Sequence, residues 1–510
     1  MEIWPPCPAP FNLAAHVLAR AETLAGKPAL EILHPDGAEI WSYARLRRAV
    51  LGCGTGLLAL GLPKDARVLM RLGNTPAFPI LYLAAIAVGL VPVPTSAALT
   101  EAEITPMAAA IAPALIVGQA GVALPDHPAP LLTDADILAM ADLPPCGYDM
   151  GDPNRLAYVV FTSGTSGRPL PVAHAHRAIW ARGMMRAGWQ GLRDSDRVLH
   201  AGAFNWTYTL GCGLLDPWVA GATALIPDAA TKPADLPALL ARHRATIFAA
   251  APGVFRQMLR AQMPPLPALR HALSAGEALP DATRAAWEDA TQTLVHQAFG
   301  LSECSTFVSG SPVLPAPHGA TGYPQAGRRI AVLDDAGQPA ATGILAIHRS
   351  DPGLMLGYLD APDQTAARFS GDWFLTGDQV AQAPNGAITY LGRHDDLMNP
   401  GGYRVSPIEV EAALARFAGV QEVAVTEVEP TAGTRIIACA YVAAHPIDQT
   451  AFAAHAAQNL ARYKQPRTFL RLDALPRNAN NKLNRRALRA SLELALRAIL
   501  EHALHSTESP

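Results

Sequence analysis

The sequence of 510 residues contains few charged side chains and almost no excess of either sign. Charged residues make up 16% of the chain, hydrophobic residues make up 50%, and the formal net charge is -3. A chain with this composition is globular rather than disordered. Its length predicts at least two domains. The near balance of charge argues against nucleic acid or an anionic membrane as a partner.

Cysteine is also scarce, and no two cysteines form a C-x-x-C pair. This scatter is typical of a reducing cytosol rather than of a disulfide framework, and it favours buried, unpaired side chains. The first ten residues, MEIWPPCPAP, lack the apolar segment of a signal peptide, so we expect a cytoplasmic protein. The six cysteines are Cys7, Cys53, Cys146, Cys212, Cys304 and Cys439.

Uninterrupted apolar segments of membrane-spanning length are missing as well. No charged residue lies between Arg71 and Glu101, a length that could span a bilayer. Proline and glycine interrupt this segment, which ends in GLVPVPTS. We therefore predict a core helix followed by an interior parallel strand.

The order of helical and apolar segments predicts the fold class. Helical stretches such as PFNLAAHVLARAETLAG alternate with short apolar runs such as ARVLMRL, ALIVG, ATALIP and ATIFAAAP. This alternation predicts a multidomain α/β protein with mostly parallel sheets. Shorter β segments follow in RRIAVLDDAGQPAATGILAIHR and GAITYLGR, and the helix–strand pattern returns after GRHDD. We place a large domain at residues 1–394 and a small α+β domain at residues 395–510.

A loop rich in serine, threonine and glycine follows the apolar run LAYVV. Its hydroxyls and glycines can direct several hydrogen-bond donors at an anion, as in a backbone anion nest. The loop is not a Walker loop, because the pattern G-x-x-x-x-G-K-[ST] is absent. The predicted phosphate-binding residues are Thr162, Ser163, Gly164, Thr165, Ser166, Gly167 and Arg168.

Five further motifs follow this loop in a fixed order. Each could be a loop with a solvated charge, but all five in this order do not arise together by chance. The motifs are SAGEALP with Gly276 and Glu277, QAFGLSECS with Phe299, Gly300, Ser302 and Glu303, WFLTGDQV with Asp378, YLGRHDDLMNPGGYRVSP with Arg393, Asp395, Gly401, Gly402 and Arg404, and LPRNANNKLNRRAL with Lys482.

With these motifs the chain resembles the adenylate-forming superfamily of acyl-CoA synthetases, peptide-synthetase adenylation domains and luciferases. The likeness runs from about residue 10 to residue 490. It implies layered α/β sheets and a small β-barrel-like subdomain in the large domain, and a mobile small domain. It also implies that a carboxylic acid and MgATP form an acyl-adenylate, and that a thiol such as that of CoA then takes the acyl group.

The resemblance implies roles for the charged and hydroxyl-bearing residues. Lys482 would bridge the acid and the α-phosphate, Ser302 would donate to that phosphate, and Glu303 would hold Mg²⁺, which prefers oxygen ligands. Arg404 is assigned to the same catalytic group. The reaction brings two anions together, the carboxylate of the acid and the α-phosphate of ATP. Catalysis would therefore depend mainly on positioning and charge neutralisation.

The nucleoside and the thiol have their own implied residues. Asp378 would accept both ribose hydroxyls through its two oxygens, and Phe299 would stack on adenine. Arg393 would contact the ribose and phosphate. Gly276, Glu277 and Gly300 are assigned to the nucleotide site, Asp395 to the hinge of the small domain, and Gly401 and Gly402 to the passage of the pantetheine arm.

The loop departs from the family where Leu170 and Pro171 replace the usual Lys-Gly pair. A charge-assisted hydrogen bond contributes roughly 1.5–3 kcal/mol, so the missing lysine matters for ATP affinity. Arg168 is the nearest cation that could replace it, together with bound Mg²⁺. His174 and His176 are alternatives.

The segment AGAFNWTYTLGCGLLDPWVAGATALI is expected to shape the acyl pocket, and it resembles medium-chain and aryl-CoA synthetases. Its apolar and aromatic residues suit an alkyl or aromatic acid, although each could equally be plain core. They are Phe204, Trp206, Tyr208 and Leu210.

Three functions stay open at this point. The first is a free-standing acid–CoA ligase, and the second is an adenylating enzyme that loads a carrier protein. The third is a degenerate nucleotide- or acyl-binding protein, which the presence of Lys482, Asp378 and Glu303 disfavours. The identity of the acid and the oligomeric state, including a homodimer, are not decided by the sequence.

The placement of Lys482 yields a first prediction. Lys482→Ala should slow adenylate formation by about 10²–10³, because one preorganised charge is lost. Thiolysis of pre-made acyl-AMP should survive, since the resemblance implies that the lysine has moved away by then. Separate assays of the two half-reactions test this, and equal losses in both would contradict it.

Overall fold

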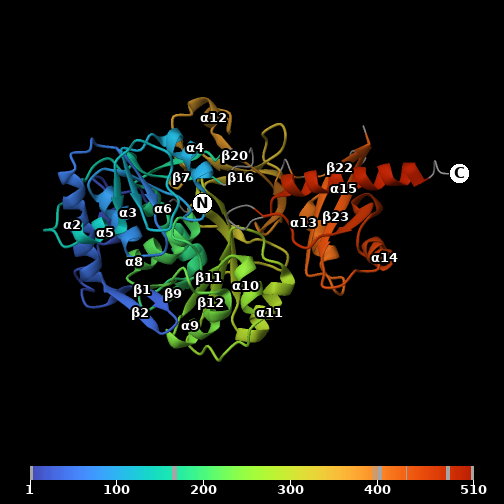
Figure 1. Cartoon of the computed structure of the whole chain (residues 1–510), viewed down its shortest axis with the longest axis horizontal. Coiled ribbons are helices and arrows are strands. Elements are labelled where there is room, and N and C mark those ends of the chain that lie inside the picture. The colour runs from blue at the N-terminus through green and yellow to red at the C-terminus, as the bar shows by residue number, and fades with distance from the viewer. Residues whose placement is uncertain are drawn as a thin grey trace. The chain divides into compact units, whose positions relative to one another are not determined.

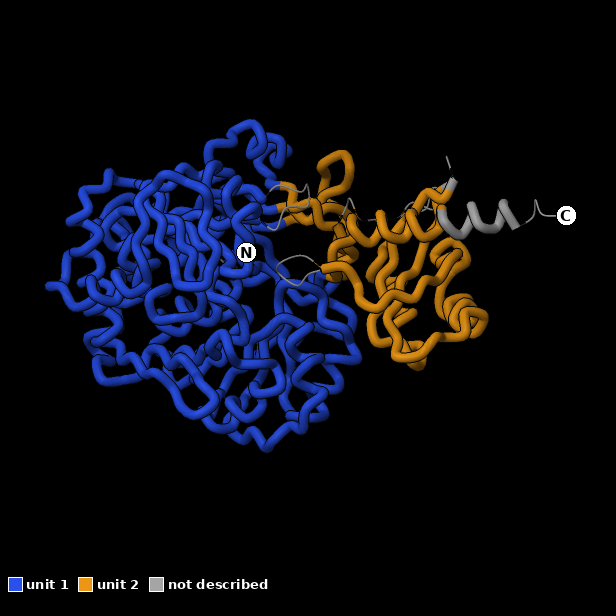
Figure 2. Tube along the Cα trace, in the orientation of Figure 1, with its two compact units in different colours: residues 1–330, 347–374, 384–388 blue, residues 331–346, 375–383, 389–510 orange. Residues whose placement is uncertain are grey.

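In the computed structural model the chain forms two compact units (Figure 2). Unit 1 comprises residues 1–330, 347–374 and 384–388, and unit 2 comprises residues 331–346, 375–383 and 389–510. The structure describes residues 4–162, 169–393, 396, 398, 405–431, 434–477 and 483–506. The functional division expected between residues 394 and 395 stays a prediction.

The largest sheet lies in unit 1 and is mostly parallel, as the alternating pattern predicts. Strands β1, β10, β9, β11, β12 and β13 pair in parallel, whereas β2, β14 and β15 are antiparallel to their neighbours. The order across the sheet is β15 (Tyr323–Pro324), β14 (Ser305–Ser309), β13 (Val295–Leu301), β12 (His271–Ala275), β11 (Ile247–Ala250), β9 (Arg197–His200), β10 (Thr223–Pro227), β1 (Pro28–His34) and β2 (Gly37–Ser42).

Successive residues of these strands pack into different cores, because side chains of a strand alternate between faces. Leu225 belongs to the core that helices α9 (Leu236–Arg242), α10 (Pro252–Met258) and α11 (Asp281–Thr291) cover. Its neighbours Ala224 and Ile226 belong to the other core. Figure 1 shows α9, α10 and α11 beside β11 and β12. The sheet is therefore a middle layer between helices.

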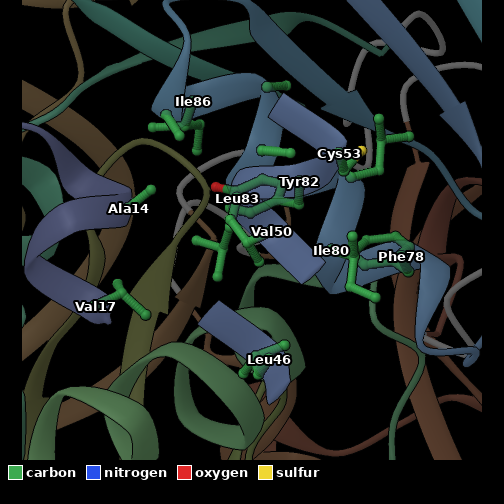
Figure 3. Close-up of a cluster of buried hydrophobic side chains, with 14 of the residues drawn as sticks. Ala14, Val17, Leu46, Val50, Cys53, Phe78, Ile80, Tyr82, Leu83 and Ile86 are labelled. Atoms are coloured by element: carbon green, nitrogen blue, oxygen red, sulfur yellow. The ribbon is translucent and has the colours of Figure 1, made fainter. Parts of the chain in front are cut away.

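The second core contains α1 (Leu13–Val17), α2 (Tyr43–Ala59) and α3 (Ala77–Ala87). Every residue of α3 is buried, as expected for a helix that is apolar on all sides. Figure 3 shows Tyr82 and Ile80 of α3 close to Val50 of α2, with Ala14 of α1 nearby. The uncharged segment after Arg71 is thus a core helix, as predicted.

The strand after α3 differs in one respect from the prediction. Strand β4 (Val91–Pro94) is buried and parallel to β3 (Arg67–Arg71), but it lies at the end of its sheet rather than in the interior. Pro92 and Pro94 lack the N–H that a central strand donates, which confines them to an edge. The order is β4, β3, β5 (Leu115–Gly118) and β6 (Leu131–Thr133). Among the helices of the described ranges, none is both long and apolar enough to cross a bilayer.

Two smaller sheets carry strands that bear on the candidate site. One has the order β18 (Gly357–Tyr358), β8 (Pro171–Ala175) and β7 (Leu156–Phe161). The other holds the β segments expected after residue 325, in the order β16 (Ile330–Leu333), β17 (Thr342–His348), β20 (Trp373–Gln382) and β19 (Phe369–Ser370), with β21 (Ile388–Arg393) paired to β20.

The C-terminal part of unit 2 has the expected α+β composition. Its sheet orders β22 (Glu422–Thr431), β23 (Thr434–Val442) and β24 (Thr468–Arg471). Helices α13 (Pro407–Leu414) and α14 (Gln449–Asn459) contribute to one core of this part. Helix α15 (Arg485–Ser506) contributes Leu488 and Leu492 to another.

The helix predicted from PFNLAAHVLARAETLAG is much shorter in the structure. Asn12 caps α1, which ends at Val17, and turns follow, with bonds such as that from Lys27 N to Leu24 O. Leu18 and Ala21 are still buried in the core, so the apolar residues after Val17 pack from turns rather than from a continued helix. All six cysteines are free, and four of them are buried, while Cys7 and Cys146 are partly exposed.

Further helices and helical turns complete the described chain. They are α4 (Glu101–Ile111), α5 (Asp134–Met140), α6 (Ala178–Ala181), α7 (Gly183–Met185), α8 (Asp216–Ala220), α12 (Pro362–Ala366), the π-helical segments η1 (Arg186–Gln190) and η2 (Thr209–Leu215), and the 3₁₀ segments η3 (Pro233–Asp235) and η6 (Arg462–Lys464).

Candidate active site

Strand β7 leads into the serine- and glycine-rich loop, and strand β8 leaves it. At the base of the loop, Thr162 N donates to the Leu170 carbonyl at 2.9 Å, and Leu170 N donates to Thr162 Oγ1 at 3.0 Å. The Thr162 hydroxyl oxygen therefore holds the base of the loop, a use that sequence analysis missed. Its predicted neighbours Ser163, Gly164, Thr165, Ser166, Gly167 and Arg168 lie outside the described residues.

The two histidines proposed as substitutes for the missing lysine are uncharged at neutral pH. Burial lowers the pKa of His174 to about 4 and that of His176 to about 3. His174 Nε2 donates to the Ser302 carbonyl at 2.8 Å, and His176 Nδ1 accepts from Leu13 N at 3.0 Å. The suggestion that either histidine supplies the missing positive charge is wrong, because the fold buries both.

Ser302 and Glu303 lie in the turn between strands β13 and β14. Glu303 is buried, and its Oε1 accepts a hydrogen bond from the Tyr358 hydroxyl at 2.8 Å. The Glu303 carbonyl accepts from Met355 N at 2.8 Å. With the bond from His174 to Ser302, the turn is held by β8 and β18, which pair with each other. Contacts within the protein therefore hold the backbone of Ser302 and both the backbone and the carboxylate of Glu303.

A buried ion pair also holds the end of this turn. Arg182 Nε and Nη2 lie 2.7 Å and 2.5 Å from the two carboxylate oxygens of Asp216. Arg182 Nη1 donates to Ser305 Oγ at 2.6 Å. Burial disfavours the charged guanidinium, but Asp216 keeps the pKa of Arg182 above its usual value. Arg182 therefore stays charged and anchors Ser305, the first residue of β14.

A second buried ion pair, between Arg328 and Asp351, contacts Thr306, the next residue of β14. Arg328 Nη1 lies 3.0 Å from Asp351 Oδ1, and Arg328 Nη2 donates to the Thr306 carbonyl at 2.8 Å. Sequence analysis identified neither pair. An isolated charge in an apolar segment, such as Asp216 in GLLDPWVAG, is the signal that could have indicated one, because a buried charge needs a partner.

Gly300 lies where β13 and β14 come closest together. A Cβ atom at this position would overlap the Ser305 carbonyl oxygen and lie 2.5 Å from Thr306 Cα. The glycine is therefore required by the hairpin itself, whereas sequence analysis assigned it only to the nucleotide. The neighbouring Phe299 is partly exposed, and its ring meets Phe307 edge-on at 5.5 Å.

Gly276 of the SAGEALP motif contacts Trp206 of the predicted acyl-pocket segment. It follows β12 with a φ of 99°, a backbone conformation that favours glycine. A Cβ atom here would lie 2.6 Å from Cζ2 of Trp206, so the two residues touch. Glu277, which comes next, is partly buried.

The four predicted pocket residues divide between two cores. Phe204 and Leu210 belong to the core of α1 to α3, where Phe204 packs against Phe78 with a centroid distance of 5.3 Å. Trp206 and Tyr208 belong to a different cluster and meet edge-on at 5.2 Å. Trp206 is the more accessible of these two. Contact of all four with an acid stays a prediction.

Asp378 and Arg393, the predicted ribose contacts of unit 2, lie together. Arg393 Nη1 is 3.3 Å and 3.4 Å from the two Asp378 carboxylate oxygens and donates to the Thr376 carbonyl at 3.0 Å. The Tyr390 hydroxyl is 3.4 Å from Asp378 Oδ1. Burial raises the pKa of Asp378, and Arg393 offsets only part of this effect.

The remaining predicted site residues lie outside the described residues: Asp395, Gly401, Gly402, Arg404 and Lys482. The described chain resumes at Leu483, just before α15. Arg485 of that helix pairs with Glu411 of α13, with nitrogen–oxygen distances of 2.6 Å and 2.9 Å. The segment that follows Lys482 is thus anchored to the core of unit 2.

The layered α/β fold and the ordered motifs together define an enzyme of the adenylate-forming class. The family model described as AMP-binding enzyme matches residues 18–359, and the model described as AMP-binding enzyme C-terminal domain matches residues 409–482. The chain belongs to the AMP-binding enzyme family.

Similar proteins cover nearly the whole chain. The benzoate–CoA ligase of Thauera aromatica is 30% identical, over 95% of this chain and 97% of its own length. The 4-hydroxybenzoate–CoA/benzoate–CoA ligase of Rhodopseudomonas palustris is 30% identical, over 94% of each chain. The crystal structure of a benzoate CoA ligase from Burkholderia xenovorans matches with a TM-score of 0.85 and 26% identity, over 94% of this chain and 100% of that one.

The closeness of β13 and β14 predicts a specific stability defect. Gly300→Ala should lower the free energy of unfolding by about 1–3 kcal/mol, because the new methyl group overlaps the backbone. Gly26→Ala is the matched control, since nothing lies within 4 Å of a Cβ at Gly26. Urea unfolding measures both variants, and equal stability of the two would contradict the packing argument.

Proposed function

We propose that this protein is an ATP-dependent aromatic acid–CoA ligase. It joins an aromatic carboxylic acid to AMP with release of pyrophosphate, and then transfers the acyl group to the thiol of CoA with release of AMP. The observation that carries the proposal is the held Ser302–Glu303 turn in a member of the AMP-binding enzyme family. The names of the relatives and the aromatic cluster of Trp206 and Tyr208 support an aromatic acid.

In the first step, an oxygen of the acid attacks the α-phosphorus of ATP, and the bond to pyrophosphate breaks. We assign to the Ser302 hydroxyl a hydrogen bond to the α-phosphate, and to Lys482 the pairing of acid and phosphate. Arg404 completes the proposed catalytic group. The bonds from His174 and Tyr358 keep the turn in place, so little reorganisation is needed during the reaction.

The Glu303 carboxylate suits a Mg²⁺ ion that arrives with ATP. It offers hard oxygen ligands and is fixed through Oε1 by Tyr358. The described residues contain no group of three or more potential metal ligands. That is compatible with Mg²⁺, which commonly takes one or two carboxylates and completes its shell with phosphate oxygens and water. The ion would neutralise phosphate charge.

The nucleoside contacts follow from the same proposal. Asp378, when ionised, accepts both ribose hydroxyls, and Arg393 lies beside it. The partly exposed Phe299 ring is proposed to stack on adenine, with Gly276 and Glu277 lining it.

For the second step we propose that the chain pivots at Asp395, and that Gly401 and Gly402 admit the pantetheine arm. The relatives are named as CoA ligases, so CoA is favoured over a carrier protein as acceptor. The free cysteines support a cytoplasmic location. A homodimer stays a proposal, which size-exclusion chromatography with light scattering can test.

The raised pKa of Asp378 predicts a pH dependence. The KM for ATP should rise as the pH falls through this pKa, because a protonated carboxyl accepts ribose hydroxyls less well. The rise should therefore begin at a higher pH than for an ordinary aspartate. Asp378→Asn should raise the KM about tenfold or more and remove this dependence, since a hydrogen bond to a charged group is lost.

The control for this variant is 2′-deoxy-ATP, which lacks one of the two ribose hydroxyls. The substitution should affect its KM less than that of ATP, since the two changes remove the same interaction. Equal effects on both nucleotides would contradict the ribose assignment.

Acid-dependent ATP–pyrophosphate exchange tests the reaction class. Aromatic acids should support exchange, and Lys482→Ala should remove most of it. AMP should then be released with CoA as acceptor but not with a holo carrier protein. Preference for a carrier protein would favour the loading enzyme, and no exchange with any acid would indicate the degenerate binding protein.

A further inference from the structure

His200 is fully buried and has no hydrogen-bond partner at either ring nitrogen. The buried residues His174, His176 and His271 differ, because each has one ring nitrogen within 2.8–3.0 Å of a backbone group. Burial lowers the pKa of His200 to about 3, so its ring is neutral and has one donor and one acceptor. A buried polar group without a partner is unfavourable, which suggests that a ligand supplies one.

Thr209, the first residue of η2, also has a buried polar atom without a hydrogen-bond partner. This atom is Oγ1 of its side chain. A Cβ atom at Gly202 would overlap Thr209 Oγ1 and lie 3.1 Å from Cε1 of His200, so both side chains border this glycine. Unused donors and acceptors from two residues therefore lie near each other.

These groups lie beside Tyr208, one of the residues predicted to shape the acyl pocket. His200 ends β9 and pairs with Ala249, which pairs with Leu273, so the three side chains share one face of the sheet. The ring of Tyr208 meets His200 edge-on at 4.3 Å. The Tyr208 hydroxyl already donates to the Leu273 carbonyl at 2.9 Å, so it leaves His200 unpaired.

The position in the sheet is also one where ligands bind. His200 is the last residue of β9, and in parallel α/β sheets ligands bind beyond the carboxyl ends of the strands. At the corresponding end of β12, Gly276 touches Trp206. Trp206 in turn meets Tyr208, the residue that contacts His200.

We propose that His200, together with Thr209, recognises a hydroxyl or amino group on the ring of an aromatic acid. This inference rests on the proposed function and adds the substrate class, a hydroxy- or amino-substituted aromatic acid. The substituent donates to the unprotonated ring nitrogen or accepts from the ring N–H, while Trp206 and Tyr208 contact the aromatic carbons. Acids without the substituent bind less well, because the polar atoms then stay unpaired.

The test compares benzoate with the hydroxybenzoates and aminobenzoates in the exchange assay. In the wild type, at least one substituted acid should exceed benzoate in kcat/KM by about tenfold or more. His200→Leu should lower kcat/KM for that acid by roughly 10–100-fold, mainly through KM, and leave benzoate nearly unchanged. His200→Gln, which keeps a donor and an acceptor, should retain part of the preference.

The matched control is His271→Leu, the same replacement at the first residue of β12, a strand of the same sheet that β11 separates from β9. It removes the bond to the Gln190 carbonyl and should lower stability without changing the preference among acids. Circular dichroism and thermal unfolding establish that each variant is folded.

The outcomes separate this inference from the proposed function. If no acid supports exchange in the wild type, the proposed function fails and the inference falls with it. If acids do support exchange, preference for benzoate over every substituted acid overturns the inference. An unchanged preference in folded His200→Leu also overturns it, and would mean that a water molecule pairs with His200. If His200→Leu does not fold, the wild-type preference and His200→Gln decide.

Discussion

The buried pair between Arg182 and Asp216 is the interaction on which the arrangement around the turn of Ser302 and Glu303 depends. Neither charge could stay buried alone, since an unpaired buried charge destabilises a protein by several kcal/mol, about 3–5 kcal/mol when one partner is removed. Gln190 also donates to Asp216 at 2.7 Å, and Arg182 donates to Ser305. A Cβ atom at Gly211 would overlap the Arg182 guanidinium, so the ion pair leaves no room for a side chain at this position. The pair therefore joins α6, η1, α8 and β14 around one point.

The groups around Ser302 and Glu303 share a common feature, which is that contacts within the protein hold each of them. His174, Tyr358 and Arg182 reach the turn from three different elements, and Arg328 holds the next residue of β14. Preorganised dipoles and charges are the usual source of stabilisation where charge develops in a reaction. The same burial that makes His174 a good structural donor removes its charge. Compensation for the missing loop lysine by Arg168 and Mg²⁺ stays a prediction from the sequence.

Local sequence patterns predicted the structure correctly where a segment adopts the conformation that its own residues favour. The short apolar runs became β3, β5, β10 and β11, and the apolar helix α3 is buried on all sides. Local sequence patterns did not predict the structure where it departs from the conformation that the pattern favours. The periodic stretch after Asn12 leaves the helical path at Leu18, and its later apolar residues are buried from turns. Strand β4 lies at an edge because prolines cannot donate to a second neighbour, although its composition resembles that of an interior strand.

By itself, the sequence determined the layered α/β class, the unpaired cysteines and the ordered motifs of the adenylate-forming superfamily, since these depend on residue type and spacing along the chain. Only the tertiary structure decided which groups meet. Tyr358 reaches Glu303 across 55 positions, and His174 reaches Ser302 across 128. The same holds for the contact of Gly276 with Trp206 and for the unpaired nitrogens of His200. The physical reason is that burial, and with it charge state and hydrogen bonding, is set by neighbours in space, which local periodicity does not encode.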